Sequence, residues 1–331
     1  MYSLLLGKKE TLQGVYPLST RWDLEYEAGL APGSLDRDEL DAHREELREV
    51  RVIFSTWTMP ALTEEEIASY FPHLQAVFYA AGSVQYFARP FLKRGVRIFS
   101  AWGANGVPVA EFTVAQILLA NKGFFPRSRI YKEKGAAGRG EMSFFPGNYG
   151  CKVGIVGAGM IGKLVIEGLR RHKLEVLVFD PFLPDETAAA LGVKKADLPT
   201  LFTECQTVSN HLANNPQTVG MLRYDLFRRM RRGATFINTG RGAQVVEADL
   251  CRLLRERPDV TALLDVTEPE PPLPESPLYT LPNVVLSPHI AGSVGEEVQR
   301  LSAYMAEEYL RYAGGQPCRW EVTEEMLATL A

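Results

Sequence analysis

Hydrophobic and polar positions alternate along the first hundred residues in the way expected of a small α/β domain. Apolar runs predict buried strands at residues 51–55, 74–80 and 96–100, and apolar periodicity predicts helices at 63–70 and 84–93. Thr63, followed by Glu64, Glu65 and Glu66, forms a capping box for the first of these helices. The charged stretch 36–49 predicts a surface helix, whereas residues 7–34 show no clear pattern and are expected to be irregular. The strands should form a parallel sheet.

A second series of elements follows. A long apolar helix is expected to begin at residues 105–108, with Pro108 near its first position, and to be buried because it is apolar on most sides. After a loop rich in glycine and arginine at 135–140, strands are expected at 153–156, 174–179, 207–211, 234–238, 260–266 and 283–287. Helical segments between most of them predict a doubly wound parallel sheet. A final apolar-periodic helix should begin near Val294 and end at Gly314.

The strand at 153–156 leads into a pattern typical of dinucleotide binding. Gly157, Gly159 and Gly162 have the spacing G-x-G-x-x-G, which allows a tight turn, close approach of a pyrophosphate and close packing of helix on strand. The free N–H groups and the positive end of the helix dipole should face the phosphates. Asp180 ends the next strand, 18 residues beyond Gly162, where an acid should meet the adenosine ribose. A carboxylate there bonds a free 2′-hydroxyl and repels a 2′-phosphate, so the expected cofactor is NAD and not NADP.

Composition narrows the class of protein. The 331 residues suggest about two domains, and the net charge of -4 gives no support for binding to nucleic acid or a membrane surface. The four cysteines lie far apart without metal-type spacing, which favours free thiols in a reducing compartment and no metal site. No apolar window is long enough to span a membrane. We therefore expect a cytoplasmic protein.

Three predicted strands end in residues that could do chemistry. Arg241 lies between two glycines after the strand at 234–238, Glu270 follows the strand at 260–266, and His289 follows the last strand. Each alone could be ordinary: a surface arginine, a solvated loop carboxylate or a helix-capping histidine. Ligands bind at the carboxyl ends of strands in open α/β sheets, so the three together favour an active site.

At these positions the chain, from about residue 50 to 313, resembles the D-isomer-specific 2-hydroxyacid dehydrogenases. The family includes D-lactate, D-glycerate and D-3-phosphoglycerate dehydrogenases and glyoxylate/hydroxypyruvate reductases. The resemblance is strongest in the glycine run and in residues 237–242, 264–266 and 287–292, with Glu270 and Pro271. Residues 100–105 and 109–111 also look like the family's interdomain segment.

The resemblance implies a fold and an assembly. It implies a Rossmann-type doubly wound parallel sheet domain, residues 106–293, inserted into a smaller flavodoxin-like α/β substrate domain formed by residues 1–105 and 294–331. The active site would lie in the cleft between the domains. The family also implies a homodimer that uses the segment from about residue 107 to 149.

The resemblance also implies roles for the three residues. Arg241 would bind the carboxylate and the 2-oxo oxygen of a small 2-oxo acid. His289 would be the general acid in reduction and the general base in oxidation, and Glu270 would bond its other ring nitrogen. The expected cofactor contacts are Gly157, Ala158, Gly159, Met160, Ile161, Gly162, Asp180, His211, Thr239, Gly240, Asp265 and Gly292, with Asp265 bonding the nicotinamide carboxamide. The expected substrate contacts are Trp57, Ala81, Gly82, Ser83 and Asn105 together with Arg241 and His289.

The sequence departs from the family pattern in ways that bear on the substrate. The carboxylate-binding turn, usually Gly-x-Gly, reads Ala-Gly-Ser at 81–83, and Trp57 stands near the place where phosphoglycerate enzymes have an arginine. These differences favour an unphosphorylated and apolar 2-oxo acid. Residues 212–215 read Leu-Ala-Asn-Asn where the family has Leu-Pro-Leu-Thr, which should alter the cofactor contacts without abolishing them. Glu270 argues against formate oxidation, because formate dehydrogenases replace this glutamate.

Two other interpretations share the nucleotide-binding pattern. An NAD-sensing scaffold, similar to the dehydrogenase-related transcriptional corepressors, would bind the cofactor with only vestigial activity. An enzyme such as adenosylhomocysteine hydrolase also has a nucleotide fold, but the arrangement of Arg241, Glu270 and His289 disfavours it. Turnover of 2-oxo acids distinguishes the dehydrogenase from the scaffold.

Overall fold

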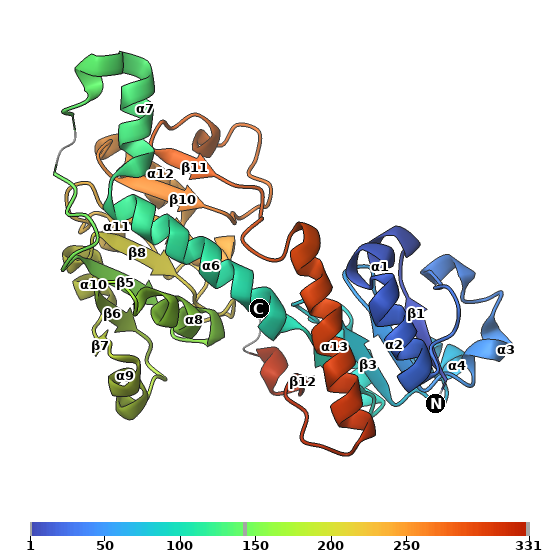
Figure 1. Cartoon of the computed structure of the whole chain (residues 1–331). Helices are drawn as coiled ribbons and strands as arrows, with labels where there is room; N and C mark the ends of the chain where they lie inside the picture. The colour runs from blue at the N-terminus through green and yellow to red at the C-terminus, as the bar shows by residue number, and fades with distance from the viewer. Residues whose placement is uncertain (1, 142–143, 329–331) are drawn as a thin grey trace. The chain divides into compact units, whose positions relative to one another are not determined.

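The computed structural model describes residues 2–141 and 144–328 of the chain. It divides into two compact units, Met1–Asn105 with Ser293–Ala331, and Gly106–Gly292 (Figure 1). The chain passes from the first unit to the second within helix α6 (Trp102–Asn121) and returns after Gly292.

The first unit is built on a five-stranded sheet. Its order is β1-β2-β3-β4-β12, and β12 alone is antiparallel. The segment 30–35 forms isolated parallel bridges with Ser3 and Leu6 along the free edge of β1. In sequence, β1 comes first, this segment second, and β2, β3 and β4 third, fourth and fifth. Counted in this way, the spatial order is 2-1-3-4-5, which is that of flavodoxin-like sheets, with β12 added beside β4. The strands are β1 (Ser3–Leu6), β2 (Val52–Ser55), β3 (Ala76–Tyr79), β4 (Arg97–Ser100) and β12 (Glu321–Val322).

Helices cover both faces of this sheet, which explains why its strands are continuous apolar runs. Leu5, Phe54 and Phe78 face a core shared with α1 (Lys9–Val15), α2 (Leu18–Ala28) and α13 (Val298–Ala313). The alternate strand positions, such as Leu4 and Ile53, face a second core under α3 (Arg44–Leu47), α4 (Glu64–Tyr70) and α5 (Ala88–Lys93). Strands buried on both sides have no polar face.

Three predictions for the first unit were wrong. Residues 7–34, expected to be irregular, contain α1 and α2; these helices bury only Leu12, Val15, Leu24 and Ala28, too few for a clear period. The single helix expected at 36–49 is a 3-10 turn, η1 (Arg37–Glu39), followed by the short α3, because the chain turns at 40–43 to bury Leu40 fully. Helix α5 begins at Ala88 and not at residue 84. The capping box at Thr63 is confirmed.

The second unit is built on a seven-stranded sheet in which every strand pair is parallel. The order is β11-β10-β9-β8-β5-β6-β7, so the strand order reverses between β5 and β8. This is the 3-2-1-4-5-6 order of dinucleotide-binding sheets, extended by one strand. The strands are β5 (Lys152–Val156), β6 (Glu175–Phe179), β7 (Lys194–Lys195), β8 (Thr207–Asn210), β9 (Thr235–Asn238), β10 (Thr261–Leu264) and β11 (Val284–Leu286).

Helices again lie on both faces of the sheet. On one face α6, α8 (Met160–Leu169) and α9 (Asp185–Leu191) share a core with Ile155 and Val178. On the other, α10 (Leu198–Glu204), α11 (Tyr224–Phe227) and α12 (Glu247–Glu256) pack over residues such as Val208 and Phe236. Helix α7 (Phe124–Lys134) follows α6. The predicted fold class, a Rossmann-type doubly wound domain and a smaller flavodoxin-like α/β domain, is confirmed.

Some helix limits differ from those predicted. Helix α6 begins at Trp102, so that Pro108 lies inside it and not at its start. Ala101 and Ala104 are packed in the core of the first unit, which favours helix before the proline. Ten of the 20 residues of this helix are buried and three, Glu111, Ala115 and Leu119, are exposed, so the helix is buried on most sides as predicted, apart from this one strip. Residues 135–138 form a 3-10 turn, η2 (Gly135–Gly138), in place of a loop. The last helix begins at Val298 after a 3-10 turn, η5 (Gly295–Glu297), and Val294 is half exposed.

Candidate active site

The glycine run in the second unit has the shape that a dinucleotide needs. Gly157 has φ +93°, and a Cβ atom on Gly162 would lie 2.1 Å from the carbonyl oxygen of Gly157, so strand and helix meet too closely for a side chain. A Cβ on Gly159 would have nothing within 4 Å. No side chain caps the N-terminus of α8. The open side of Gly159 and the uncapped N–H groups therefore fit a pyrophosphate.

Asp180 is fixed beside this loop at the end of β6. Its Oδ2 accepts a hydrogen bond from the N–H of Ala158 at 2.7 Å, and its Oδ1 accepts one from the N–H of Phe182 at 2.8 Å. The bond from Ala158 holds the carboxylate against the glycine run at the topological switch point, where a dinucleotide lies in folds of this kind, and the bond from Phe182 fixes its orientation. Its contact with the ribose stays a prediction.

His211 lies under the same loop. Its carbonyl oxygen is 2.8 Å from where a Cβ on Gly157 would be, and its ring Nε2 lies 2.9 Å from the hydroxyl of Ser209. Burial lowers the pKa of His211 to about 4, because the charged ring would lose its hydration. The imidazole is therefore neutral at ordinary pH, and its contact with the cofactor stays a prediction.

Arg241 lies in the turn between β9 and the 3-10 turn η3 (Gly242–Gln244). A Cβ on Gly242 would lie 1.9 Å from the carbonyl carbon of Thr267, so this turn packs directly on the backbone that follows β10. Burial lowers the pKa of the Arg241 guanidinium, and the negative charge of Glu270 opposes that shift. Arginine remains charged through such shifts, so the site has a permanent positive charge near the carboxylate of Glu270.

His289 and Glu270 form a direct pair. The ring Nδ1 lies 2.6 Å from Oε1 of Glu270, and the two side chains are 49% and 41% exposed. The ring therefore has one nitrogen held by a carboxylate and the other, Nε2, available to a substrate. His289 also has φ 54°, a left-handed value that non-glycine residues rarely adopt. Backbone strain of this kind is found at functional sites, where the surrounding structure holds it.

Asp265 holds the loop that contains His289. Its carboxylate is almost fully buried, and Oδ1 accepts from the hydroxyl of Ser287 at 2.6 Å and from the N–H of Ile290 at 2.9 Å. Its Oδ2 accepts from the N–H of Ala291 at 2.9 Å. The predicted role of Asp265 was a contact with nicotinamide, which stays a prediction. Its bonds on both sides of His289 were not anticipated, because no spacing in the sequence indicates them.

The remaining cofactor residues lie in the second unit as well. The hydroxyl of Thr239 is 3.0 Å from that of Thr113 on α6, and the N–H of Gly240 donates to Oδ1 of Asn238 at 3.1 Å. Gly292 is the last residue of the unit. Thr239 and Gly240 directly precede Arg241 in the chain, and Gly292 follows His289 by three residues; their cofactor contacts stay predictions.

The predicted substrate contacts other than Arg241 and His289 belong to the first unit. Within that unit Trp57 follows β2, and the turn 81–83 follows β3, at the carboxyl ends of neighbouring parallel strands. The hydroxyl of Ser100 donates to the carbonyl oxygens of Ala81 and Gly82 at 2.9 and 2.6 Å. The side-chain oxygen of Asn105 accepts from the N–H of Ser293 at 3.0 Å. The bonds from Ser100 fix the turn and the bond from Ser293 fixes Asn105, but the binding roles stay predictions.

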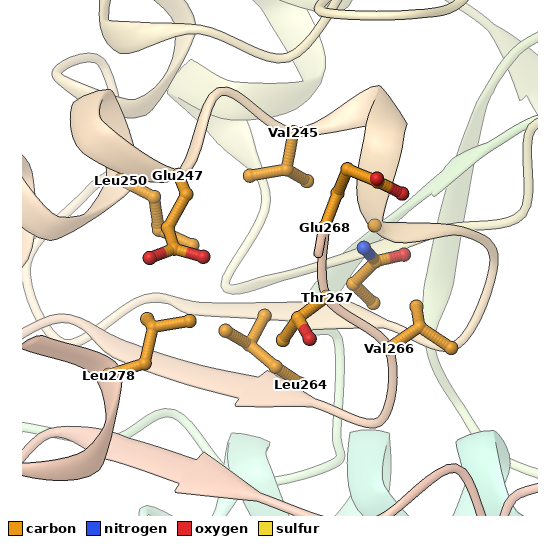
Figure 2. A pocket seen from close by; sticks show the side chains of 10 residues that line it. Val245, Glu247, Leu250, Leu264, Val266, Thr267, Glu268 and Leu278 are labelled. Carbon is orange, nitrogen blue, oxygen red and sulfur yellow. The ribbon is translucent and has the colours of Figure 1, made fainter. Parts of the chain in front are cut away.

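A small pocket lies beside the candidate residues without including them. Figure 2 shows its largely apolar lining, with the carboxylates of Glu247 and Glu268 towards opposite sides. It opens between η3 and the backbone after β10, where Gly242 meets Thr267. None of Arg241, Glu270 and His289 lines it, so we do not assign the reaction to this pocket.

The described residues show neither a group of metal-binding side chains nor a helix that could span a membrane. Among residues 2–141 and 144–328, no group of three or more His, Cys, Asp or Glu side chains could hold a metal ion. No helix in the described ranges is long and apolar enough to cross a membrane. The four cysteines are free, and Cys151, Cys205 and Cys251 are buried.

Comparison with known proteins identifies relatives. Residues 114–291 match the family model of the D-isomer specific 2-hydroxyacid dehydrogenase, NAD binding domain. The D-3-phosphoglycerate dehydrogenase of Archaeoglobus fulgidus is 33% identical over 229 residues, which are 69% of this chain and 43% of that protein. The glyoxylate reductase of Korarchaeum cryptofilum is 29% identical over 279 residues, 82% of each chain. The chain thus spans less than half the length of the phosphoglycerate dehydrogenase.

Solved structures show the same fold over nearly the whole chain. A phosphoglycerate oxidoreductase from Rhizobium etli has a TM-score of 0.79 at 21% identity and covers 98% of this chain and 99% of its own. The apo D-mandelate dehydrogenase of Rhodotorula graminis has a TM-score of 0.78 at 20% identity, with 98% of both chains covered. With the family model matching more than half of its residues, the chain belongs to the D-isomer-specific 2-hydroxyacid dehydrogenase family, and its second unit is an NAD-binding domain.

Proposed function

We propose that the protein is an NAD-dependent oxidoreductase that interconverts a 2-oxo acid and its D-2-hydroxy acid. The observation that carries this proposal is the contact of 2.6 Å between His289 Nδ1 and Glu270 Oε1, with the partly buried Arg241 near Glu270, in an NAD-binding domain. Turnover of a 2-oxo acid, and not this geometry alone, separates the proposal from a scaffold that only senses NAD.

The three side chains divide the chemistry. Arg241 binds the substrate carboxylate and the 2-oxo oxygen with two N–H groups, and its charge stabilises the negative charge that develops on that oxygen. His289 donates a proton from Nε2 to the oxygen in reduction and accepts it in oxidation. Glu270 holds Nδ1, which orients the ring and leaves Nε2 towards the substrate. NAD, when bound, exchanges a hydride at the nicotinamide C4.

For the substrate we infer an unphosphorylated 2-oxo acid with an apolar side chain, bound in part by the first unit. Trp57 is 45% exposed, and residues 55–62 include no lysine or arginine that could pair with a phosphate. The hydroxyl of Tyr86 donates to the carbonyl oxygen of Met59 at 3.0 Å, which ties the Trp57 segment to the chain just after the turn 81–83. The aromatic side chains at this edge suit an apolar group better than a phosphate.

A panel of 2-oxo acids with NADH, followed by the loss of NADH absorbance, tests the proposal. His289→Ala should lower kcat/KM about 10²–10⁴-fold and leave NADH binding unchanged, because the ring acts only in proton transfer. His43→Ala is a matched control, since His43 also contacts a glutamate, Glu46, at 3.1 Å on the surface of the first unit. A protein that binds NADH but turns over no 2-oxo acid would be the scaffold.

We also propose a homodimer that forms through residues 107–149. Helices α6 and α8 border an apolar hollow of about 450 Å³, lined by residues that include Val114, Leu118 and Leu164. Leu119, Phe124 and Tyr149 are 40%, 49% and 85% exposed, which is unfavourable unless another surface covers them. Light scattering should give twice the chain mass. Leu119→Glu should lower the measured mass, whereas Leu310→Glu in α13 should not.

We also propose a cytoplasmic location. The four free thiols support it, because cysteines stay unpaired in a reducing compartment.

A further inference from the structure

Three amide side chains are buried together behind Arg241. Asn210 ends β8, Asn238 ends β9 and Gln244 ends η3, and each is at most 1% exposed. The Nδ2 group of Asn210 donates to Oε1 of Gln244 at 2.6 Å and to Oδ1 of Asn238 at 3.0 Å. Buried amides are costly unless they are hydrogen-bonded, so a connected group of three fixes the geometry of its surroundings.

This group holds the backbone of Arg241 on both sides. Oε1 of Gln244 accepts from the N–H of Arg241 at 3.3 Å, and Nδ2 of Asn238 donates to the carbonyl oxygen of Arg241 at 3.1 Å. The backbone of Arg241 is extended, with φ -139° and ψ 149°. With both of its peptide groups held, the direction in which the guanidinium leaves the chain is set by the amides.

The same group reaches the segment next to the dinucleotide loop. Nε2 of Gln244 donates to the carbonyl oxygen of Leu212 at 2.8 Å, and Oδ1 of Asn210 accepts from the N–H of Leu212 at 3.3 Å. Leu212 follows His211, whose carbonyl packs against Gly157. Gln244 is therefore bonded both to the turn of Arg241 and to the chain beneath the glycine run.

We propose that Gln244 is a positioning residue for Arg241, and this inference rests on the proposed function. It aligns the guanidinium for the substrate carboxylate and ties that alignment to the cofactor side of the sheet. Only an amide can accept twice through its oxygen and donate through its nitrogen at this place. Leucine would leave the N–H of Arg241 and the carbonyl of Leu212 without these partners, and a charged glutamate would set an oxygen against the carbonyl of Leu212.

Steady-state kinetics with NADH and a 2-oxo acid substrate test the role of Gln244. Gln244→Leu should raise KM for the 2-oxo acid about tenfold, as expected for a loosened binding group, with little change in the dissociation constant of NADH. Gln206→Leu is the matched control, because Gln206 is also buried, donates to Gly233 at 2.6 Å and lies just before β8. It should lower the unfolding temperature without raising KM.

Gln244→Glu keeps the shape of the side chain and provides a second test of the positioning role if the leucine variant fails to fold. Its loss of activity at about pH 8 should be largely reversed at about pH 6 relative to the wild type, because a protonated carboxyl can again donate to Leu212. In an Arg241→Lys background, Gln244→Leu should add little. Unchanged KM in Gln244→Leu, a Gln244→Glu variant with the wild-type pH profile, or full additivity with Arg241→Lys would overturn the inference. A harmless Arg241→Lys would instead overturn the proposed function itself.

Discussion

The backbone N–H of His289 donates to the carbonyl oxygen of Asp265 at 3.0 Å, while the Asp265 carboxylate accepts from the two backbone N–H groups that follow His289. Asp265, which directly follows β10, thus accepts hydrogen bonds from the backbone of His289 and of the two residues after it. This explains how a non-glycine residue keeps φ 54°. The His289 N–H also lies 3.0 Å from the carbonyl oxygen of Ser287, so its backbone is held both by Asp265 and by its own loop.

Replacing Asp265 with asparagine should therefore weaken the loop. An amide nitrogen cannot accept a hydrogen bond, so at least one of the donors Ile290 and Ala291 or Ser287 would lose its partner in a buried place. The free energy of unfolding should fall by about 1–3 kcal/mol in urea titrations, and kcat should fall with it. Glu268→Gln, an exposed carboxylate three residues away, should change neither. Stability and kcat at wild-type values in Asp265→Asn would show that the bonds do not hold the loop.

A pair of glycine substitutions separates the fold of the dinucleotide loop from its binding. In Gly162→Ala the new Cβ would lie 2.1 Å from the carbonyl oxygen of Gly157, so the apo protein should lose about 1–3 kcal/mol of stability. In Gly159→Ala the Cβ meets nothing within 4 Å, so the apo protein should unfold as the wild type does. NADH binding, followed by its fluorescence, should nevertheless weaken in Gly159→Ala. Tight NADH binding by that variant would mean that the pyrophosphate does not approach Gly159.

Local patterns predicted the sheets and the places of the candidate residues. Strands such as β2 are buried on both sides and are therefore largely apolar. Arg241 and His289 each lie three residues after the end of a strand, β9 and β11 respectively. Helices α1 and α2 escaped prediction because they touch the core at few positions. The start of α6 was predicted too late, because a proline such as Pro108 more often begins a helix than lies inside one.

The contacts that position the candidate site could not be predicted from the sequence. They join residues that lie far apart along the chain, such as Asn210 and Gln244, or Gly242 and Thr267. A buried amide has the same local sequence signal as an amide in a loop. Only the register of β8 beside β9 shows that Asn210 and Asn238 are paired across the sheet.

Cofactor choice should follow Asp180. Its carboxylate is fixed by Ala158 and Phe182, so a 2′-phosphate on the ribose would meet a negative charge that cannot turn away. NADH should have a much lower KM than NADPH. Asp180→Ala should narrow the ratio of the two KM values about tenfold or more, mainly by weakening NADH, since a charge-assisted bond is lost. A preference of the wild-type enzyme for NADPH would refute the assignment of NAD specificity to this carboxylate.

His211 should make the stability of the protein depend on pH. Burial lowers its pKa to about 4 in the folded chain, against the ordinary value of 6.5, so between these values the unfolded chain binds more protons. The stabilisation is complete above pH 6.5 and is lost as the pH falls towards 4, by about 3 kcal/mol in total. His211→Gln cannot titrate, so urea unfolding at about pH 7 and pH 4.5 should show a smaller loss than in the wild type. His73→Gln, at an exposed position, should keep the wild-type loss. Equal losses in the wild type and His211→Gln would mean that the ring becomes protonated without unfolding.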